Sequence, residues 1–225
     1  MSVCSCIHCG CPVEIHNIFC DFCKKFALKN SRYCKRCGSF ILFETKDREC
    51  SFCIDKNIFF DNVFTVYLYS GIIPSIINRM KYGKNYDLAI LLGKHLSFFL
   101  PDFFKKSDLI VYPPMTFKDR FRRSFNQAAV FSEIISRRHG INIAGKAIEK
   151  TRNTKPQASL TGEERARNLQ NAFAVKKNIS GTDILLIDDV ATTLTTVNSI
   201  SKILKENGAG SVKVATLART TEYFM

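Results

Sequence analysis

Ten cysteines lie within the first 53 residues of this 225-residue chain, and none follows them. Eight of the ten form four CxxC pairs, and the pairs repeat: "CIHCG" followed by "CDFC" is echoed by "CKRCG" followed by "CSFC". So abrupt a change in composition indicates a domain boundary. We therefore expect a small cysteine-rich domain over residues 1–57 and a second domain over residues 58–225.

Each half of the repeat has the spacing of a metal site. Two CxxC turns can place four thiolates around one ion, and the glycine after a turn relieves backbone crowding. We expect two structural zinc ions in a double zinc ribbon, which does not fold without metal because it has little apolar sequence. The predicted ligands are Cys6, Cys9, Cys20 and Cys23 for the first ion, and Cys34, Cys37, Cys50 and Cys53 for the second.

Disulfides and redox CxxC chemistry are the alternatives to zinc. Disulfides need an oxidising compartment, and no signal peptide opens the chain. A redox CxxC occurs once within a βαβ unit, whereas four pairs occur here. Cys4 and Cys11 are expected to be free thiols near the first site, although His8 or His16 can in principle replace a ligand. No coordination position is expected to be open for catalysis.

The longest apolar segment does not suit a membrane. "LAILLGKHLSFFL" is interrupted by Lys94 and His95 and is too short to span a bilayer. We expect a cytoplasmic protein without membrane insertion.

Residues 58–225 alternate between strand-like and helix-like segments, which indicates an α/β domain built on a doubly wound parallel sheet with its ligand site at the carboxyl ends of the strands. Asn85, Asn126 and Gly140 are predicted helix ends, and one helix is expected to bury a stripe from Leu88 to Phe99 that includes Leu91. Thr161 begins a short charged helix with a capping box. The expected strands are residues 62–69, 108–112, 183–189 and 211–218.

The stretch "ILLIDDVATTLTTV", residues 184–197, combines a buried strand, two carboxylates, a threonine-rich turn and a helix start. Carboxylates at a strand end can accept hydrogen bonds from sugar hydroxyls, and a helix N-terminus favours phosphate. The alternative is that the acidic and threonine side chains only cap the helix.

This stretch resembles the phosphoribosyl-pyrophosphate motif of type I phosphoribosyltransferases. Together with "YSGIIPSIINRMKYG", "RFRRSFNQA", "RNTKPQASLTGEERARNLQNAF" and "VATLAR", it makes nearly the whole chain similar to the ComF family of competence proteins. The resemblance implies a phosphoribosyltransferase-like parallel sheet behind a double zinc ribbon. It also implies that ribose and 5-phosphate contact Asp188, Asp189, Ala191, Thr192, Thr193, Leu194, Thr195 and Thr196.

Two residues depart from the pattern of the family. Leu194 stands where the motif has glycine, and Ser124 stands where the family commonly has glycine before "FNQ". Glycine permits positive φ and close approach of the backbone to an anion, so the leucine is expected to narrow or reshape the phosphate pocket.

The formal charge of +13 favours a polyanionic partner over a merely solvated basic surface. Two segments, residues 117–138 and 150–177, together carry +9 of it. Phe121 and Phe125 are expected either to stack bases or to pack in the core. The candidate nucleic-acid-binding residues are Lys118, Arg120, Arg122, Arg123, Arg152, Lys155, Arg165 and Arg167.

Three functions follow as hypotheses. The first is a ComF-like protein of natural transformation that handles single-stranded DNA during DNA uptake. The second is an active phosphoribosyltransferase that uses phosphoribosyl pyrophosphate with Mg²⁺. The third makes the zinc ribbons a docking platform for a DNA-translocating ATPase or a recombination protein.

Overall fold

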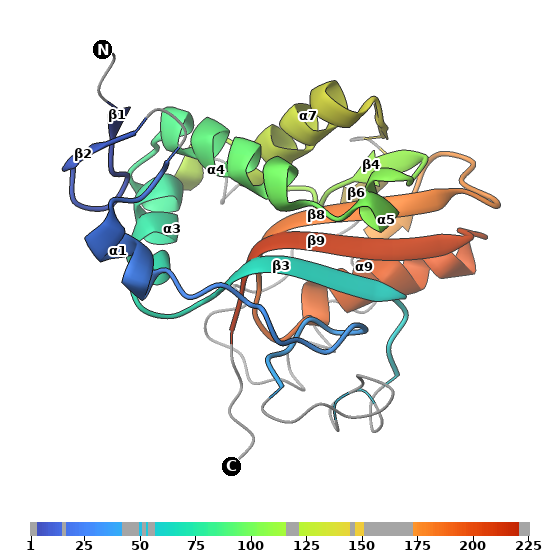
Figure 1. Cartoon of the computed structure of the whole chain (residues 1–225). Coiled ribbons are helices and arrows are strands. Elements are labelled where there is room, and N and C mark those ends of the chain that lie inside the picture. Colours follow the sequence, from blue (N-terminus) through green and yellow to red (C-terminus); the bar gives the residue numbers. More distant parts are fainter. Residues whose placement is uncertain are drawn as a thin grey trace.

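A parallel sheet of five strands forms the centre of the computed structural model, which describes residues 4–14, 17–41, 50, 53, 57–115, 122–144, 147–150 and 173–220 (Figure 1). All neighbouring strands are parallel, so the predicted α/β sheet is confirmed. In spatial order the strands are β3 (Asn62–Leu68), β9 (Ser211–Arg219), β8 (Asp183–Ala191), β4 (Leu109–Val111) and β5 (Asn142–Ile143).

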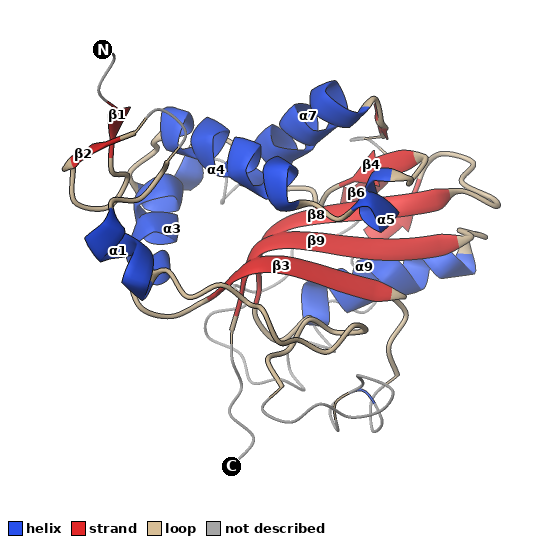
Figure 2. Ribbon diagram, in the orientation of Figure 1, coloured by secondary structure: helices blue, strands red, loops and turns tan. Residues whose placement is uncertain are grey.

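Helices cover both faces of this sheet (Figure 2). Strand β8 shows why: Leu185 and Ile187 are buried in one apolar cluster, and Ile184 and Leu186 in another. A strand buried on both faces is a near-continuous apolar run, as this one is. One face carries α3 (Ile73–Tyr82), α4 (Tyr86–Phe99), α5 (Asp102–Lys105) and α7 (Gln127–His139), and the other carries α9 (Thr195–Glu206).

The predicted helix ends are confirmed, and one predicted core residue is wrong. Asn85 Oδ1 accepts a hydrogen bond from Leu88 N at 2.9 Å, and Asn126 Oδ1 caps α7 in the same way. Gly140 ends α7 at a φ of 72°. Leu91, however, is 37% exposed, because α4 turns this residue away from the sheet. The predicted helix at Thr161 lies outside the described residues.

The N-terminal segment is joined to the sheet by backbone hydrogen bonds. It contains β1 (Cys4–Ser5), β2 (Pro12–Val13) and α1 (Asp21–Phe26). Asn30 N donates to Val66 O at 3.0 Å and Leu68 N donates to Leu28 O at 2.9 Å, so residues 28–30 cover the outer edge of β3. An unpaired edge strand is a site of aggregation, and this segment protects it.

Two features complete the fold. Strands β6 (Ile148–Lys150) and β7 (Phe173–Val175) form a separate antiparallel pair.

Of the helices that the structure describes, none has the length and apolar character needed to cross a membrane.

Candidate functional site

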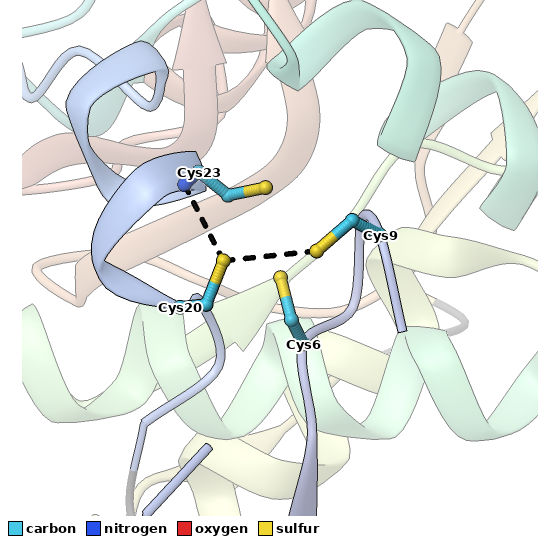
Figure 3. Close-up of side chains that lie close together, drawn as sticks. All are labelled: Cys6, Cys9, Cys20 and Cys23. Atoms are coloured by element: carbon cyan, nitrogen blue, oxygen red, sulfur yellow. Dashed lines mark hydrogen bonds between the residues drawn. The ribbon is translucent and has the colours of Figure 1, made fainter. Parts of the chain in front are cut away.

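The eight predicted metal ligands form two groups of four. The first cysteine cluster consists of Cys6, Cys9, Cys20 and Cys23 (Figure 3), and the second consists of Cys34, Cys37, Cys50 and Cys53. Within each cluster all the sulfur atoms lie within 4.8 Å of one another. The pairing of CxxC turns predicted from the repeat is therefore confirmed.

The repeat in the sequence is also a repeat in backbone geometry. Gly10 N donates to Cys6 O at 2.9 Å, and Gly38 N donates to Cys34 O at 2.8 Å. The two glycines have φ values of 79° and 71°, which a larger residue rarely adopts. The residues that follow them, Cys11 and Ser39, occupy equivalent places, because each accepts a 2.8 Å hydrogen bond from the first cysteine of its turn.

Sulfur spacing in the clusters fits a tetrahedral metal site. The distance is 3.6 Å between Cys9 Sγ and Cys20 Sγ and 3.4 Å between Cys37 Sγ and Cys50 Sγ. Four sulfurs bound to zinc at 2.3 Å are about 3.8 Å apart, whereas a disulfide is about 2.05 Å long.

The other cysteine and histidine side chains of this region are not part of the first cluster as far as the structure describes them. His8 contributes no nitrogen to the cluster, and its Nδ1 lies 3.5 Å from Ser75 Oγ. Cys11 is an exposed free thiol. His16 and the side chain of Cys4 lie outside the described part of the chain.

The two predicted sugar-binding carboxylates stand near the carboxyl end of β8, and they have different surroundings. Asp189 is 7% exposed and pairs with Lys81 of α3, whose Nζ lies 2.8 Å from Oδ2. Asp188 Oδ1 accepts a hydrogen bond from Asp189 N at 2.8 Å. Neither caps α9, because its N-cap residue is Leu194 and has no side-chain capping bond. Capping of α9 by the two aspartates is therefore wrong, and capping by the threonines stays a prediction.

The carboxyl group of Asp188 has a raised pKa. Burial, and then the neighbouring Asp189 carboxylate, raise the pKa of Asp188 to about 7, against the smaller opposing effects of Lys81 and Arg123. A carboxyl group that titrates near neutral pH can donate or accept a hydrogen bond. Such a group can contact a sugar hydroxyl in either protonation state.

The threonine-rich turn keeps a conformation that normally needs glycine. Leu194 has a φ of 60° and is 4% exposed, with its side chain in the apolar cluster on the α9 side of the sheet. Ser124, the other departure from the family pattern, also has a positive φ, of 65°. Both positions thus require the freedom that glycine offers. Beside Leu194, the Oγ1 atoms of Thr193 and Thr195 lie 2.8 Å apart. The narrowing of the pocket by leucine stays a prediction.

A buried arginine, which is not among the site residues predicted from the sequence, holds this turn. Arg219 is fully buried at the end of β9, and its Nη1 donates to the carbonyl oxygens of Ala191 and Thr192. Its Nη2 donates to Ser39 Oγ at 3.1 Å, and Ser39 Oγ lies 3.3 Å from Cys37 Sγ. A hydroxyl can accept one hydrogen bond and donate another. The second cysteine cluster is therefore linked to the turn after Asp189.

Two of the eight predicted nucleic-acid-binding residues lie in the described chain. Arg122 and Arg123 lie over the ring of Tyr82, at 5.5 Å and 5.8 Å from its centroid. Phe125 is half-buried and packs edge-to-face with Tyr86, which favours core packing over base stacking. Phe121 and the remaining six basic residues lie outside the described part of the chain: Lys118, Arg120, Arg152, Lys155, Arg165 and Arg167.

Known proteins resemble the chain over nearly its whole length. Competence protein F of Haemophilus influenzae is 30% identical over 223 residues, which cover 95% of this chain and 96% of that protein. The chain belongs to the ComF family of competence proteins. DNA utilization protein YhgH of Escherichia coli is 28% identical to this ComF-family chain over 96% of both proteins. Competence protein ComFC of Streptococcus pneumoniae is 27% identical over 68% of the chain and 66% of that protein.

Solved structures of phosphoribosyltransferases, and of an amidotransferase, resemble part of this ComF-family protein. A hypoxanthine-guanine phosphoribosyltransferase from Bacillus anthracis has a TM-score of 0.40 and 14% identity, over 58% of this chain and 68% of that one. Glutamine phosphoribosylpyrophosphate amidotransferase from B. subtilis has a TM-score of 0.42 and 18% identity, over 63% of this chain and 30% of that one. No protein-family model matches the chain.

Proposed function

We propose that this ComF-family protein binds and handles single-stranded DNA in the cytoplasm during DNA uptake. The match over 95% of the chain to a protein named competence protein F carries the proposal. The formal charge of +13 supports it, because binding to phosphates releases counterions and favours basic proteins. Arg122 and Arg123 over the 49% exposed ring of Tyr82 add cations beside an aromatic face, the combination that single-strand-binding surfaces use.

A titration with labelled single-stranded oligothymidylate, and with a duplex of equal length, tests this proposal. We expect tighter binding of the single strand, with an association constant that falls as salt rises. The Arg122→Ala/Arg123→Ala variant is expected to bind more weakly and to lose about 1.4 from the slope of log affinity against log salt. Lys105→Ala/Lys106→Ala removes two cations at the end of α5 and serves as the control. Equal affinity for the duplex, or an affinity independent of salt, would count against the proposal.

We further propose that each cysteine cluster holds one structural Zn²⁺. Sulfur distances of 3.4 to 3.8 Å in the two clusters support a tetrahedral ion. Bound zinc would hold together segments that have few apolar side chains of their own. We expect two zinc ions per chain by elemental analysis, and a tetrahedral thiolate spectrum after replacement by Co²⁺. Disulfides found by mass spectrometry in protein purified without oxidant would contradict this assignment.

A second candidate function is binding of Mg²⁺-phosphoribosyl pyrophosphate and transfer of its phosphoribosyl group. The specific observation in its favour is that Leu194 keeps the positive φ of 60°, so the turn retains a glycine-like backbone beside Asp188. Asp188 and Asp189 would accept hydrogen bonds from the ribose hydroxyls, and Lys81 would have to release Asp189 or contact the ligand. In transfer, diphosphate would leave with the bonding electron pair as an acceptor adds to the sugar carbon.

Titration of Mg²⁺-phosphoribosyl pyrophosphate into wild-type protein and Asp188→Asn/Asp189→Asn tests this second function. Binding by the wild type that the double variant loses would support it. Absence of binding by the wild type, together with binding by Leu194→Gly, would exclude it for the natural protein. Measuring DNA binding on the same double variant shows whether the two ligands share one site.

The docking of a DNA-translocating ATPase or a recombination protein on the cysteine clusters stays a prediction. Phe22 and Phe26 give it a defined surface, since they are 69% and 45% exposed and their ring centroids lie 5.2 Å apart. A Phe22→Ala variant that binds DNA normally and loses a partner would support this role. Deleting residues 1–57 is a poor test, because residues 28–30 cover the edge of β3.

A further inference from the structure

A groove separates the first cysteine cluster from helix α4. Its walls come from residues 17–29 on one side and from α4 on the other, with Arg138 of α7 at one end and Tyr67 of β3 at the base. Its volume is about 540 Å³, within the range of pockets that hold small organic ligands. Cys20 and Cys23 do not line the groove themselves, but they are neighbours in sequence of Phe19 and Lys24, which do.

Cationic side chains surround the groove. Lys24, Lys29, Lys94 and Arg138 all line it and all are exposed. Among the described residues, no aspartate or glutamate lines the groove, and none of these four cations pairs with a carboxylate. Four unneutralised charges around one hollow attract an anionic ligand.

Aromatic rings stand between these cations. Phe98 is 64% exposed, and the Arg138 guanidinium lies 5.6 Å from its ring centroid. Lys29 Nζ lies 4.3 Å from the centroid of Phe99, the next residue of α4. An exposed aromatic ring beside cations is the combination on which proteins stack the bases of single strands. The ring of Phe98 therefore offers a stacking face beside positive charge.

The base of the groove carries no charge at neutral pH. Tyr67 Oη and His95 Nε2 lie 2.5 Å apart, and their rings are stacked with an interplanar angle of 2°. Burial, and then the nearby Lys29, lower the pKa of His95 to about 4, so its imidazole is neutral. The groove thus combines an uncharged aromatic floor with a cationic rim, and this matches a ligand whose flat apolar parts alternate with phosphates.

We propose that this groove binds a segment of single-stranded nucleic acid, with one base stacked on Phe98 and its flanking phosphates against Lys29 and Lys94. This inference rests on the proposed DNA-handling function and gives it a second surface, whose lining does not include Arg122 or Arg123. A duplex does not fit, because its bases are paired inside the helix and cannot enter a hollow between two walls. Stacking makes binding tolerant of sequence, since every base has an aromatic face.

The test is a titration of labelled single-stranded oligothymidylate into full-length, metal-loaded protein and four variants. Phe98→Ala removes the stacking ring, and Lys29→Ala/Lys94→Ala removes two rim charges. The matched controls are Phe103→Ala, a 54% exposed phenylalanine of α5, and Lys105→Ala/Lys106→Ala. We expect Phe98→Ala to bind roughly tenfold more weakly. The lysine double variant is expected to lose about 1.4 from the slope of log affinity against log salt. Both controls are expected to match the wild type.

The outcomes separate the groove from the proposed function as a whole. If wild type binds oligothymidylate and both Phe98→Ala and Lys29→Ala/Lys94→Ala bind equally well, the groove is excluded and the DNA-handling function stands. If wild type does not bind, both are overturned. A weakened lysine variant with an unchanged Phe98→Ala variant overturns base stacking in the groove. Circular dichroism and zinc content of each variant show that it is folded, which is expected because every replaced side chain at the groove is exposed.

Discussion

The two cysteine clusters arise from one repeated sequence, and the fold places them in different surroundings. In the second cluster Cys34 and Cys37 are fully buried within the core that also contains α9. In the first cluster Cys6 and Cys23 are also buried in a core, but Cys9 is exposed, and the neighbouring segment forms a wall of the cationic groove. The same metal turn can therefore support a hydrophobic core in one place and a ligand-binding surface in another.

The contrast extends to the residue after each turn. Ser39 of the second cluster accepts a hydrogen bond from Arg219, whose guanidinium also holds the carbonyl oxygens of Ala191 and Thr192. Cys11, its equivalent in the first cluster, is exposed. Only the second cluster is thus joined, within the described residues, to the turn after Asp189. Substitutions in the second cluster should therefore destabilise the fold and the turn after Asp189. Substitutions in the first cluster should alter the surface around the cationic groove.

The largest difference in thermal stability is expected between two variants that each remove one thiolate, one from each cluster. Cys37→Ser leaves buried sulfurs without full coordination, and structural zinc contributes about 10–16 kcal/mol in small zinc domains. Because a whole domain is stable by only about 5–15 kcal/mol, this variant should lack a cooperative thermal transition. Cys9→Ser is expected to keep the transition at a lower temperature and to lose one zinc ion. Thermal unfolding by circular dichroism, with elemental analysis, measures both effects. Equal loss in the two variants would remove the distinction drawn between the clusters.

The next largest effect concerns the link from the second cluster to the turn. Arg219→Leu removes the donor that joins the carbonyl oxygens of Ala191 and Thr192 to Ser39, and leaves these carbonyls only their bonds from Thr220, at a cost of about 3 kcal/mol in the free energy of unfolding. Arg219→Lys should recover less than half of the loss, because one ammonium cannot reach both the turn and Ser39 as a planar fork does. Urea unfolding measures these changes. Full rescue by lysine would mean that charge, and not the bridging geometry, stabilises the turn.

A smaller effect on the free energy of unfolding depends on pH. It tests whether the burial of the Asp188 carboxyl group beside the turn lowers stability. The folded-state pKa of Asp188, about 7, lies above the value of about 3.9 expected in the unfolded chain. The unfolded state therefore releases this proton first, and the group lowers stability as pH rises from about 4 to 7. Asp188→Asn removes this penalty. It should be more stable than the wild type by about 2 kcal/mol at pH 8, which is half of the about 4 kcal/mol that the full pKa shift represents because Asp188 is only half-buried, and no more stable near pH 4.

Asp102 provides the control for this pH dependence. The hydrogen bond from Lys105 lowers its pKa, so Asp102 contributes stability above the unfolded-state pKa and loses it as pH falls. Asp102→Asn should therefore reduce stability slightly at pH 8, opposite in sign to Asp188→Asn. If both variants change stability in the same direction, the environment assigned to Asp188 is wrong.

Features set by local sequence could be predicted, and features set by packing could not. The CxxCG turns and the caps Asn85 and Asn126 depend on residues a few positions apart, and all are confirmed. A strand over residues 183–189 is predicted because an apolar run suits a strand buried on both faces, and β8 covers it and continues to Ala191. The family was recognised from several such motifs in order.

The missed features depend on contacts between distant segments. Lys81 and Asp189 form an ion pair across 108 positions of the sequence, and a charged residue at a strand end, such as Arg219, gives no sign of burial. Leu91 fits the apolar stripe of α4, yet it lines the groove, because what lies opposite a helix face is set by tertiary structure.

The smallest effect compares the two equivalent residues directly. Ser39→Ala removes an acceptor from the buried Arg219 and a hydroxyl 3.3 Å from Cys37 Sγ, and should cost about 1 kcal/mol in the free energy of unfolding. Cys11→Ala changes an exposed thiol and should cost almost nothing. In the Arg219→Leu background the cost of Ser39→Ala should shrink, because the two residues share one hydrogen bond. Urea unfolding of the four proteins in this cycle measures that coupling. A cost of Ser39→Ala that is unchanged in the Arg219→Leu background would mean that the second cluster and the turn are stabilised independently, and that the two halves of the repeat differ only in burial.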